Sequence, residues 1–352
     1  MSGPPPSPRF RSPFAGKDLR GRDERPYHAP AGLLAAADAA LVLGAPLLLT
    51  GEPGSGKTDF AFVAGNALGT EVLPCHVRSD TRARDLLYHF DALRRFADAQ
   101  HGSEEDRRRA ADPRNYVHLN GLGRGLLSPK RLVVLIDEVD KAPRDLPNDL
   151  LRELDRERGE FEIPEIDEDV AARLGEGPKV FGSPLQRVMR RDPKRAPMPF
   201  VVITSNAERQ LPEPFLRRCV FYHIAFPDKE QLLTIARERN LRRDGDGRDP
   251  EPLLAANLLD PAVKIFRALR AAFALTKPPS TAELLTWIEV LGTVFEPRAL
   301  GVQLREYAAC FGDEDLKPLR APRSWRQLPA VNCLLKLEED LERLDRRVSP
   351  AS

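Results

Sequence analysis

The sequence is poor in the features that mark several common classes of protein. It has only four cysteines in 352 residues. They lie far apart and none belongs to a CxxC pair, which argues against both a disulfide framework and a cysteine zinc site. A reducing compartment, the cytoplasm, fits this cysteine usage best. The four positions are Cys75, Cys219, Cys310 and Cys333.

An excess of charge of one sign is also missing. The chain has 54 Lys and Arg against 53 Asp and Glu, which gives a formal net charge of +1. The positive field that draws most nucleic-acid-binding proteins onto phosphate backbones is therefore absent, so nucleic acid is not expected as a partner. The six histidines add no ligand-like spacing, and no cysteine lies beside them to complete a metal site.

Long hydrophobic runs are absent as well. The longest apolar stretches, 41–49 and 132–136, fall well short of the roughly 20 residues that span a bilayer, so no membrane segment is expected. Residues 1–26 begin with prolines and carry charges throughout. A secretory signal would need an apolar run of about 7 to 15 residues, so this stretch predicts a disordered, proline-rich tail instead.

The apolar residues that are present, 41% of the chain, form short runs separated by helical segments. Such alternation predicts an α/β fold with a parallel sheet sandwiched by helices. A helix is expected over 149–158, where the sequence reads DLLRELDRER. The strand-like runs are LLLT at 47–50, RLVVLIDE at 131–138 and FVVITSN at 200–206.

The same pattern suggests where the domains lie. We expect an α/β core over 27–226, with insertions at about 76–129 and 159–199 that exceed ordinary connections between strands and helices. Strand signals then stop, which predicts a small all-helical domain over 227–325 and a C-terminal helix and tail over 326–352. A leucine stripe in that last helix favours packing on the helical domain over an independent coiled coil.

The strongest chemical signal is the sequence GEPGSGKT, which satisfies GxxxxGK[ST] between a strand and a helix. Its glycines let backbone N–H groups converge on phosphate oxygens at a helix N-terminus. The lysine is expected to reach the β- and γ-phosphates, and the threonine to bind Mg²⁺. A glycine-rich turn without a ligand is the alternative. The predicted phosphate-binding residues are Gly51, Glu52, Pro53, Gly54, Ser55, Gly56, Lys57 and Thr58.

Two acidic residues follow the second strand-like run, at the edge where open α/β sheets bind ligands. Asp137 is the candidate for holding Mg²⁺ together with Thr58, and Glu138 for orienting and polarising an attacking water. Because these are the two roles that hydrolysis needs, the pair predicts that ATP is hydrolysed as well as bound. The alternative is a strand that runs into an acidic turn.

The third run ends in Thr204, Ser205 and Asn206. A polar side chain at this position could sense the γ-phosphate, although Ser and Asn after a strand are also ordinary turn residues.

Taken together and in this order, with LPEPFLRRCVFYHIAFP following, these segments resemble an AAA+ ATPase, and more narrowly the MoxR branch of that family. The resemblance covers about residues 27–295. It implies a P-loop core, a helical lid over 227–325, insertions that line a ring, and ATP and Mg²⁺ as cofactors. It also implies that Asn206 is the sensor-1 residue. The motifs do not distinguish ATP from GTP, because the P-loop contacts the phosphates, which both nucleotides share.

The resemblance implies further site residues near the end of the core and in the lid. Arg218 stands where the family places its arginine finger, with Arg217 as the fallback; two solvated arginines at a helix end are the alternative. The lid departs from the pattern, since Ala282 falls near the position of the family's sensor-2 arginine. Sensor 2 is then either shifted to Lys277 or absent, and Ser280 with Glu283 predicts a capping box.

In this family the insertions face the central pore or the partner. The candidates for such contacts are Leu122 and Arg124 in the loop around 121–125, and Phe161 in one arm of a predicted hairpin; a structural role is the alternative for each.

The resemblance implies a homo-oligomeric ring, by expectation a hexamer, that remodels a client protein, with a von Willebrand factor A domain protein as a candidate partner. Two other hypotheses about the function remain. One is a nucleotide-gated switch in a signalling or defence assembly, and the other is a GTP- or ATP-driven subunit of a restriction-type nuclease complex.

Overall fold

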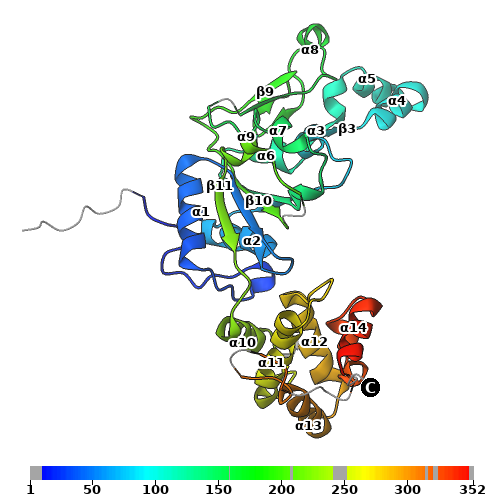
Figure 1. The fold of residues 1–352 in the computed structure, drawn as a ribbon. Coiled ribbons are helices and arrows are strands. Elements are labelled where there is room, and N and C mark those ends of the chain that lie inside the picture. Colours follow the sequence, from blue (N-terminus) through cyan, green and yellow to red (C-terminus); the bar gives the residue numbers. More distant parts are fainter. Residues whose placement is uncertain are drawn as a thin grey trace, which may run out of the picture. The chain divides into compact units, whose positions relative to one another are not determined.

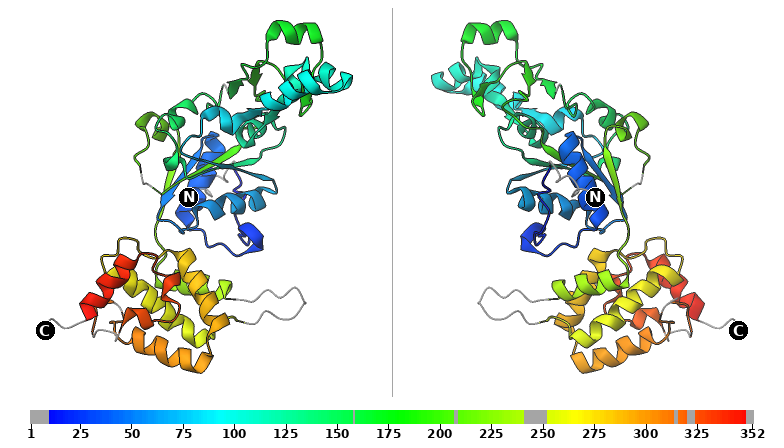
Figure 2. Two further views of the ribbon diagram at one scale, coloured as in Figure 1. Left: turned by 90° about the vertical axis from the view of Figure 1, so that its right-hand side faces the viewer. Right: turned by 90° about the vertical axis from the view of Figure 1, so that its left-hand side faces the viewer.

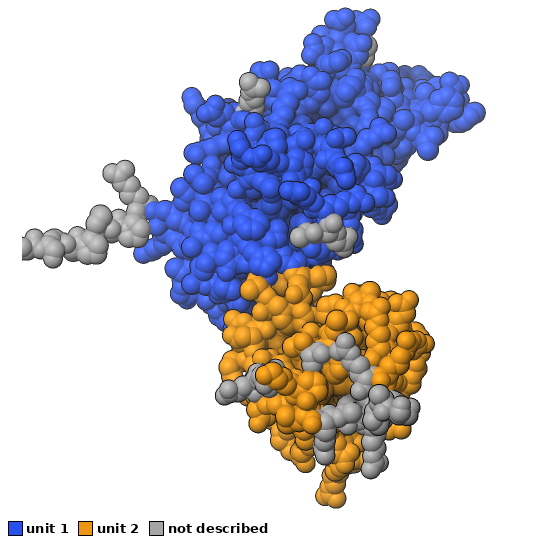
Figure 3. Space-filling view, viewed as in Figure 1, with its two compact units in different colours: residues 1–51, 56–224 blue, residues 52–55, 225–352 orange. Residues whose placement is uncertain are grey.

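The computed structural model describes residues 10–157, 159–206, 209–240, 252–313, 316–319 and 324–348. They group into two compact units, coloured separately in Figure 3. The first contains residues 1–51 and 56–224, and the second contains residues 52–55 and 225–352. Within the described residues, no helix combines the length and the apolar character that crossing a membrane requires.

A five-stranded parallel sheet forms the centre of the first unit (Figure 1). Its strands lie in the order β11-β1-β10-β5-β2, so the three predicted strands, β1, β10 and β5, are adjacent. The sheet confirms the predicted α/β class. The bounds are β1 Leu47–Gly51, β2 Val72–His76, β5 Val133–Asp137, β10 Phe200–Ser205 and β11 Val220–Ile224.

Both faces of this sheet are covered, which explains why its central strands read as continuous apolar runs. Successive side chains of a strand point to opposite faces. Leu47 and Leu49 accordingly pack with α1 (Ala31–Leu43) and α2 (Lys57–Leu68). Leu48 belongs to the other core, together with residues of α3, α6 and α7.

The first insertion supplies two of those covering helices, α3 and α6, and two further helices, α4 and α5. Its elements are α3 Ala83–Leu87, β3 Tyr88–Phe90, α4 Ala92–His101, α5 Glu104–Ala110, η2 Pro113–Tyr116, β4 Val117–Leu119 and α6 Gly121–Leu127. Strands β3 and β4 pair antiparallel, and α4 and α5 lie between them in the chain. The two additional views in Figure 2 show α4 and α5 at the same end of this unit as α8 of the second insertion.

The predicted contact loop around 121–125 is a helix. Leu122 is fully buried, because glycines at 121, 123 and 125 let α6 approach the sheet and α3 closely. Phe161 is also buried, at 1% exposure. The expectation that Leu122 and Phe161 contact a partner is therefore wrong for both residues. Arg124 is partly exposed and pairs with Glu71 at 3.3 Å.

The second insertion contains the predicted hairpin, with β6 (Glu160–Glu162) paired antiparallel to β9 (Val188–Arg190). The helix expected over 149–158 is absent: α7 ends at Asp149, and residues 150–154 form turns. This prediction was wrong because Leu150 and Leu154, whose spacing suggests a helix, are buried in a non-helical turn instead. The remaining elements are η3 Val139–Lys141, α7 Leu146–Asp149, α8 Glu168–Leu174, β7 Lys179–Val180, β8 Ser183–Pro184 and α9 Glu213–Leu216.

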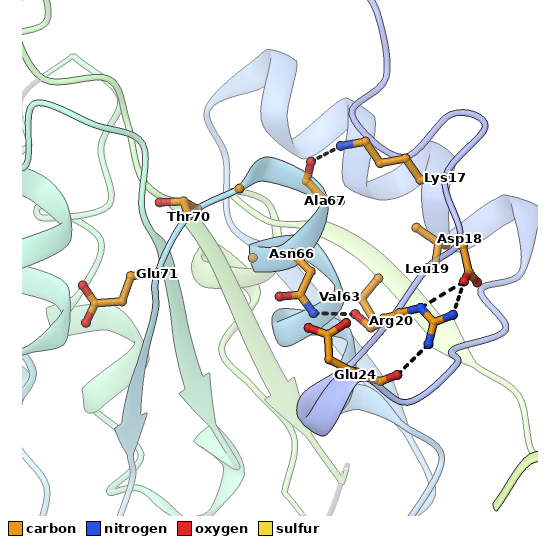
Figure 4. A pocket seen from close by; sticks show the side chains of 12 residues that line it. Lys17, Asp18, Leu19, Arg20, Glu24, Val63, Asn66, Ala67, Thr70 and Glu71 are labelled. Carbon is orange, nitrogen blue, oxygen red and sulfur yellow. Dashed lines mark hydrogen bonds and ion pairs between the residues drawn. The ribbon is translucent and has the colours of Figure 1, made fainter. Parts of the chain in front are cut away.

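Residues 10–26, for which the sequence predicts a disordered tail, instead pack against α2. Phe14 is 2% exposed, with its ring centroid 5.9 Å from that of Phe60. Lys17 donates to the Ala67 carbonyl at the end of α2, and the Asn66 amide donates to the Arg20 carbonyl at 2.9 Å. Figure 4 shows the last two of these contacts around a pocket between the two segments. The prediction failed because the proline-rich and charged composition of this stretch gives no indication that Phe14 is buried. Residues 1–9 lie outside the described residues.

The second unit is helical, and its main segment begins at Ala225, close to the predicted start of the helical domain. Its core includes buried Trp287 and Trp325, and the leucines of the last helix join it. Residues 326–348 therefore pack on the helical domain. The elements are α10 Lys229–Arg239, α11 Ala256–Ala272, α12 Thr281–Val294, α13 Pro297–Ala308, η4 Trp325–Gln327, η5 Val331–Cys333 and α14 Glu338–Val348, with η1 Arg22–Glu24 in the first unit.

Candidate functional site

The P-loop lies between β1 and α2, where the sequence places it. Gly51 ends β1, and Gly56 precedes Lys57, the first residue of α2. Gly51, Gly54 and Gly56 have φ of 148°, 77° and 88°. L side chains rarely adopt such values, so glycine is needed for this turn.

Within the loop, Lys57 is buried at 6% exposure, and its Nζ donates to the Gly51 carbonyl at 2.9 Å. The loop is therefore closed by its own lysine, which holds the ammonium group close to the backbone that would surround phosphates.

The tip of the P-loop, residues 52–55, groups with the second unit. Glu52 and Pro53 are exposed, and Glu52 forms an ion pair with Arg270 of α11 in that unit. Arg270 also stacks on Phe226, with its guanidinium carbon 3.6 Å from the ring centroid. No sequence pattern marks Arg270, because a lone arginine in an amphipathic helix gives no signal.

The edge of the sheet brings the predicted hydroxyl and carboxylates together. Asp137 ends β5, and its Oδ1 accepts hydrogen bonds from the hydroxyls of Thr58, at 2.8 Å, and Thr204, at 2.7 Å. The strand order explains this meeting, because β10, which carries Thr204, lies between β1 and β5. Thr204 is one of the three polar residues named at the end of this predicted strand, but nothing in the sequence indicated that it contacts Asp137.

Glu138 follows Asp137 in the left-handed conformation, with φ 58°. One carboxylate oxygen, Oε1, accepts from the Asn206 side-chain amide at 3.3 Å. The other, Oε2, pairs with the ammonium of Lys141 at 2.5 Å. Lys141 was not predicted as a site residue. It lies three positions after Glu138, in η3, and this spacing is the sequence signal for the ion pair. Glu138 and Asn206 are therefore brought together as the motif order suggests.

Tyr27 connects the N-terminal segment to the P-loop. Its hydroxyl donates to the Gly56 carbonyl at 3.2 Å, and its ring lies against Phe60. Burial, with the charges of Asp59 and Tyr222 adding to it, raises the pKa of Tyr27 above its usual range, so the hydroxyl stays protonated and able to donate.

The remaining predicted residues have described contacts of their own. Arg218 is exposed just after α9, and its Nη1 donates to the Leu151 carbonyl at 2.8 Å; Arg217 pairs with Glu213. Lys277 is exposed in the second unit, where its backbone N–H donates to the buried Asp340 carboxylate at 3.1 Å. Ser280 and Glu283 form the expected capping box at the start of α12. None of the contacts described for Arg218 joins it to Lys57 or Glu138.

The residues present fit a magnesium-bound nucleoside triphosphate. The Ser55 hydroxyl oxygen is shielded from solvent and has no hydrogen-bond partner among the described residues, as expected of a donor held for a ligand. The hard oxygens of Thr58 and Asp137 are the ligand type that Mg²⁺ prefers, and it binds proteins through few of them, alongside phosphates and water. Among the described residues no larger cluster of metal ligands occurs.

This arrangement, a P-loop and an acidic strand end on one parallel sheet, is that of a P-loop nucleotide-binding core. The comparison with protein families agrees: residues 46–218 match the model of the AAA domain, dynein-related subfamily. That span includes the P-loop, both acids, Asn206 and Arg218. A comparison with curated proteins finds no match.

Two solved structures resemble the chain distantly. The Thermotoga maritima RuvB Holliday junction branch migration motor is 15% identical, with a TM-score of 0.40 over 89% of this chain and 84% of that one. A protein of Cytophaga hutchinsonii described as "a putative ATPase" is 15% identical, with a TM-score of 0.34 over 79% of this chain and 66% of that one. Likenesses this weak carry no conclusion about function.

Proposed function

We propose that the protein is a MoxR-like AAA+ ATPase that hydrolyses ATP to remodel a client protein. The observation that carries this proposal is the meeting of Thr58, Asp137, Glu138 and Asn206 at one sheet edge, next to a P-loop closed by Lys57. Phosphate binding, metal binding and activation of water need these groups within one site.

In this proposal each residue has a separate role. Lys57 leaves the Gly51 carbonyl to contact the β- and γ-phosphates, while the N–H groups of the loop and the N-terminus of α2 surround them. Thr58 and Asp137 hold Mg²⁺, which when bound neutralises charge that develops on the phosphate oxygens. Glu138 accepts a proton from the attacking water, and Asn206 fixes the position of the Glu138 carboxylate.

The proposal also includes a ring, by expectation a hexamer, in which Arg218 acts on the site of the neighbouring subunit. Arg218 is exposed, and its described hydrogen bond goes to a backbone carbonyl, which a stronger anionic partner would displace. The family resemblance supports a protein client, with a von Willebrand factor A domain partner as the first to test, and a cytoplasmic location.

The second candidate is a nucleotide-gated switch with little turnover. It is favoured by the second unit, where Ala282 stands near the family's sensor-2 position and Lys277 is tied through its backbone to Asp340. Tight partner binding that depends on nucleotide, with slow hydrolysis that does not vary with protein concentration, would favour this function. A restriction-type nuclease subunit is a third reading, which duplex binding at physiological salt or a preference for GTP would revive.

The replacement Glu138→Gln tests the proposed chemistry. Glutamine keeps the shape of the side chain but cannot accept the proton, so we expect nearly unchanged ATP binding and turnover reduced by about 100-fold or more. ATP binding is measured by fluorescence of a labelled nucleotide, and turnover by phosphate release. Glu105→Gln on the exposed surface of α5 makes the same chemical change away from the site and should leave both values unchanged. Unchanged turnover in Glu138→Gln would exclude Glu138 as the base.

A further inference from the structure

Thr204 contacts both acids of the candidate site, although the sequence assigns it no separate role. It is 1% exposed, on the central strand β10, which pairs with β1 on one side and β5 on the other. In the register Ile203 faces Ile136, the residue before Asp137. The strand pairing therefore brings the Thr204 side chain to the end of β5 where the two acids begin.

The Thr204 hydroxyl uses both of its hydrogen-bonding functions on these acids. It donates to Asp137 Oδ1 at 2.7 Å and accepts from the backbone N–H of Glu138 at 2.8 Å. A hydroxyl has one proton to donate and lone pairs to accept, so the two bonds are compatible. One buried side chain thus fixes the carboxylate of Asp137 and the backbone of Glu138 together.

The backbone of Glu138 needs such support. Its left-handed conformation costs an L-residue about 1–2 kcal/mol. That conformation turns the chain directly after β5, where the Glu138 side chain reaches Asn206. A partly buried N–H without an acceptor would add a further cost, and Thr204 supplies that acceptor.

We propose that Thr204 is a positioning residue that couples the magnesium-binding carboxylate to the water-activating glutamate. This inference rests on the proposed function of Asp137 and Glu138. The Thr58 hydroxyl shares Asp137 Oδ1 with Thr204, so the three side chains form one hydrogen-bonded row from α2 to β10. Threonine suits the role because its branched β-carbon restricts rotation about χ1.

Thr204→Val provides the test, since valine keeps the size and branching of threonine and removes the hydroxyl. We measure binding of a fluorescent ATP analogue as a function of Mg²⁺ concentration, together with turnover. Loss of one hydrogen bond to a charged group is expected to raise the Mg²⁺ concentration at half-saturation by about tenfold. Binding without Mg²⁺ should not change, and turnover at saturating Mg²⁺ should fall as Glu138 loses its support.

Two further variants separate the hydroxyl from packing. Thr204→Ser keeps the hydroxyl and should restore most of the Mg²⁺ dependence. Thr81→Val removes another buried hydroxyl, one that accepts from the Arg78 N–H at 2.8 Å outside the site, and should leave Mg²⁺ dependence unchanged. If Thr204→Val fails to fold, Thr204→Ala replaces it in the comparison with serine.

A Thr204→Val protein with the wild-type Mg²⁺ dependence would overturn the inference, as would equal losses in the valine and serine variants. A wild-type protein that binds Mg²⁺-ATP without any turnover would overturn the proposed hydrolysis instead, while the Mg²⁺ titration still decides on Thr204. The two failures are therefore distinguishable.

Discussion

At the scale of single residues, backbone conformation decides what the candidate site can hold. Gly56 has φ 88° and its carbonyl accepts from Tyr27. A Cβ added there would lie 3.2 Å from Cε2 of the Tyr27 ring. Glycine is therefore required at this position for two reasons, the turn and the aromatic ring that covers it.

The two reasons can be separated by a pair of alanine substitutions. Gly69, at the other end of α2, has φ 64° and nothing within 4 Å of an added Cβ. Gly69→Ala should therefore lower the free energy of unfolding only by the cost of the left-handed conformation, about 1–2 kcal/mol. Gly56→Ala should lower it further and weaken ATP binding. Thermal or urea unfolding gives the first quantity and nucleotide titration the second; equal losses in both variants would contradict a role for Tyr27.

At the scale of elements, the two insertions are joined into one body within the first unit. Tyr88 of β3 donates to the Glu165 carboxylate at 2.8 Å, and its ring stacks on Phe161 of β6. Arg114 of η2 is 4% exposed and donates to the Gly175 carbonyl at 3.0 Å. A force on α8 is therefore expected to reach the first insertion as well.

The Tyr88→Phe substitution tests this connection. It removes the bond to a carboxylate that is mostly buried, so we expect the free energy of unfolding to fall by about 1.5 kcal/mol. Amide hydrogen exchange should accelerate in α8, while α2 stays protected.

The matched control is Tyr116→Phe, which removes a 2.7 Å bond to Asp98 within the first insertion. It should accelerate exchange in α4 and leave α8 unchanged. If Tyr88→Phe left exchange in α8 at the wild-type rate, the insertions would move independently.

At the scale of the whole molecule, the proposed ring makes each site depend on two subunits. Turnover per subunit should then rise steeply with protein concentration. Over the same concentrations, size measurements in the presence of ATP and Mg²⁺ should show larger assemblies. Flat turnover from a monomer would contradict a shared site and favour the switch.

Mixing two inactive variants gives a stricter test. The Arg218→Ala variant keeps the proposed base Glu138 but lacks the arginine finger. The Glu138→Gln variant keeps the arginine finger but lacks the base. In a randomly mixed ring, about a quarter of the sites combine Glu138 of one subunit with Arg218 of the next, because the interface is heterologous. We expect the mixture to recover turnover of that order, measured by phosphate release. Arg217→Ala serves as control and should be active alone; no recovery in the mixture would place Arg218 outside the neighbouring site.

The sequence by itself determined the class of fold and the main chemical groups. Uninterrupted apolar runs are found where a strand is covered on both faces, so β1, β5 and β10 could be predicted from those runs alone. The spacing of GEPGSGKT predicted both the turn and the start of α2, because glycine and a helix N-terminus are local requirements.

The tertiary structure alone decided which side chains meet. Strand order brings Thr204 to Asp137, which also accepts from Thr58. Thr204 lies 67 positions from Asp137 and 146 from Thr58 in sequence, and no local pattern encodes that order. The same holds for residues 10–26, where Phe14 becomes buried only because α2 offers Phe60, and for Leu122, which three glycines bring into the core. Local preferences set the turns and strands, whereas burial depends on partners that are distant in the chain.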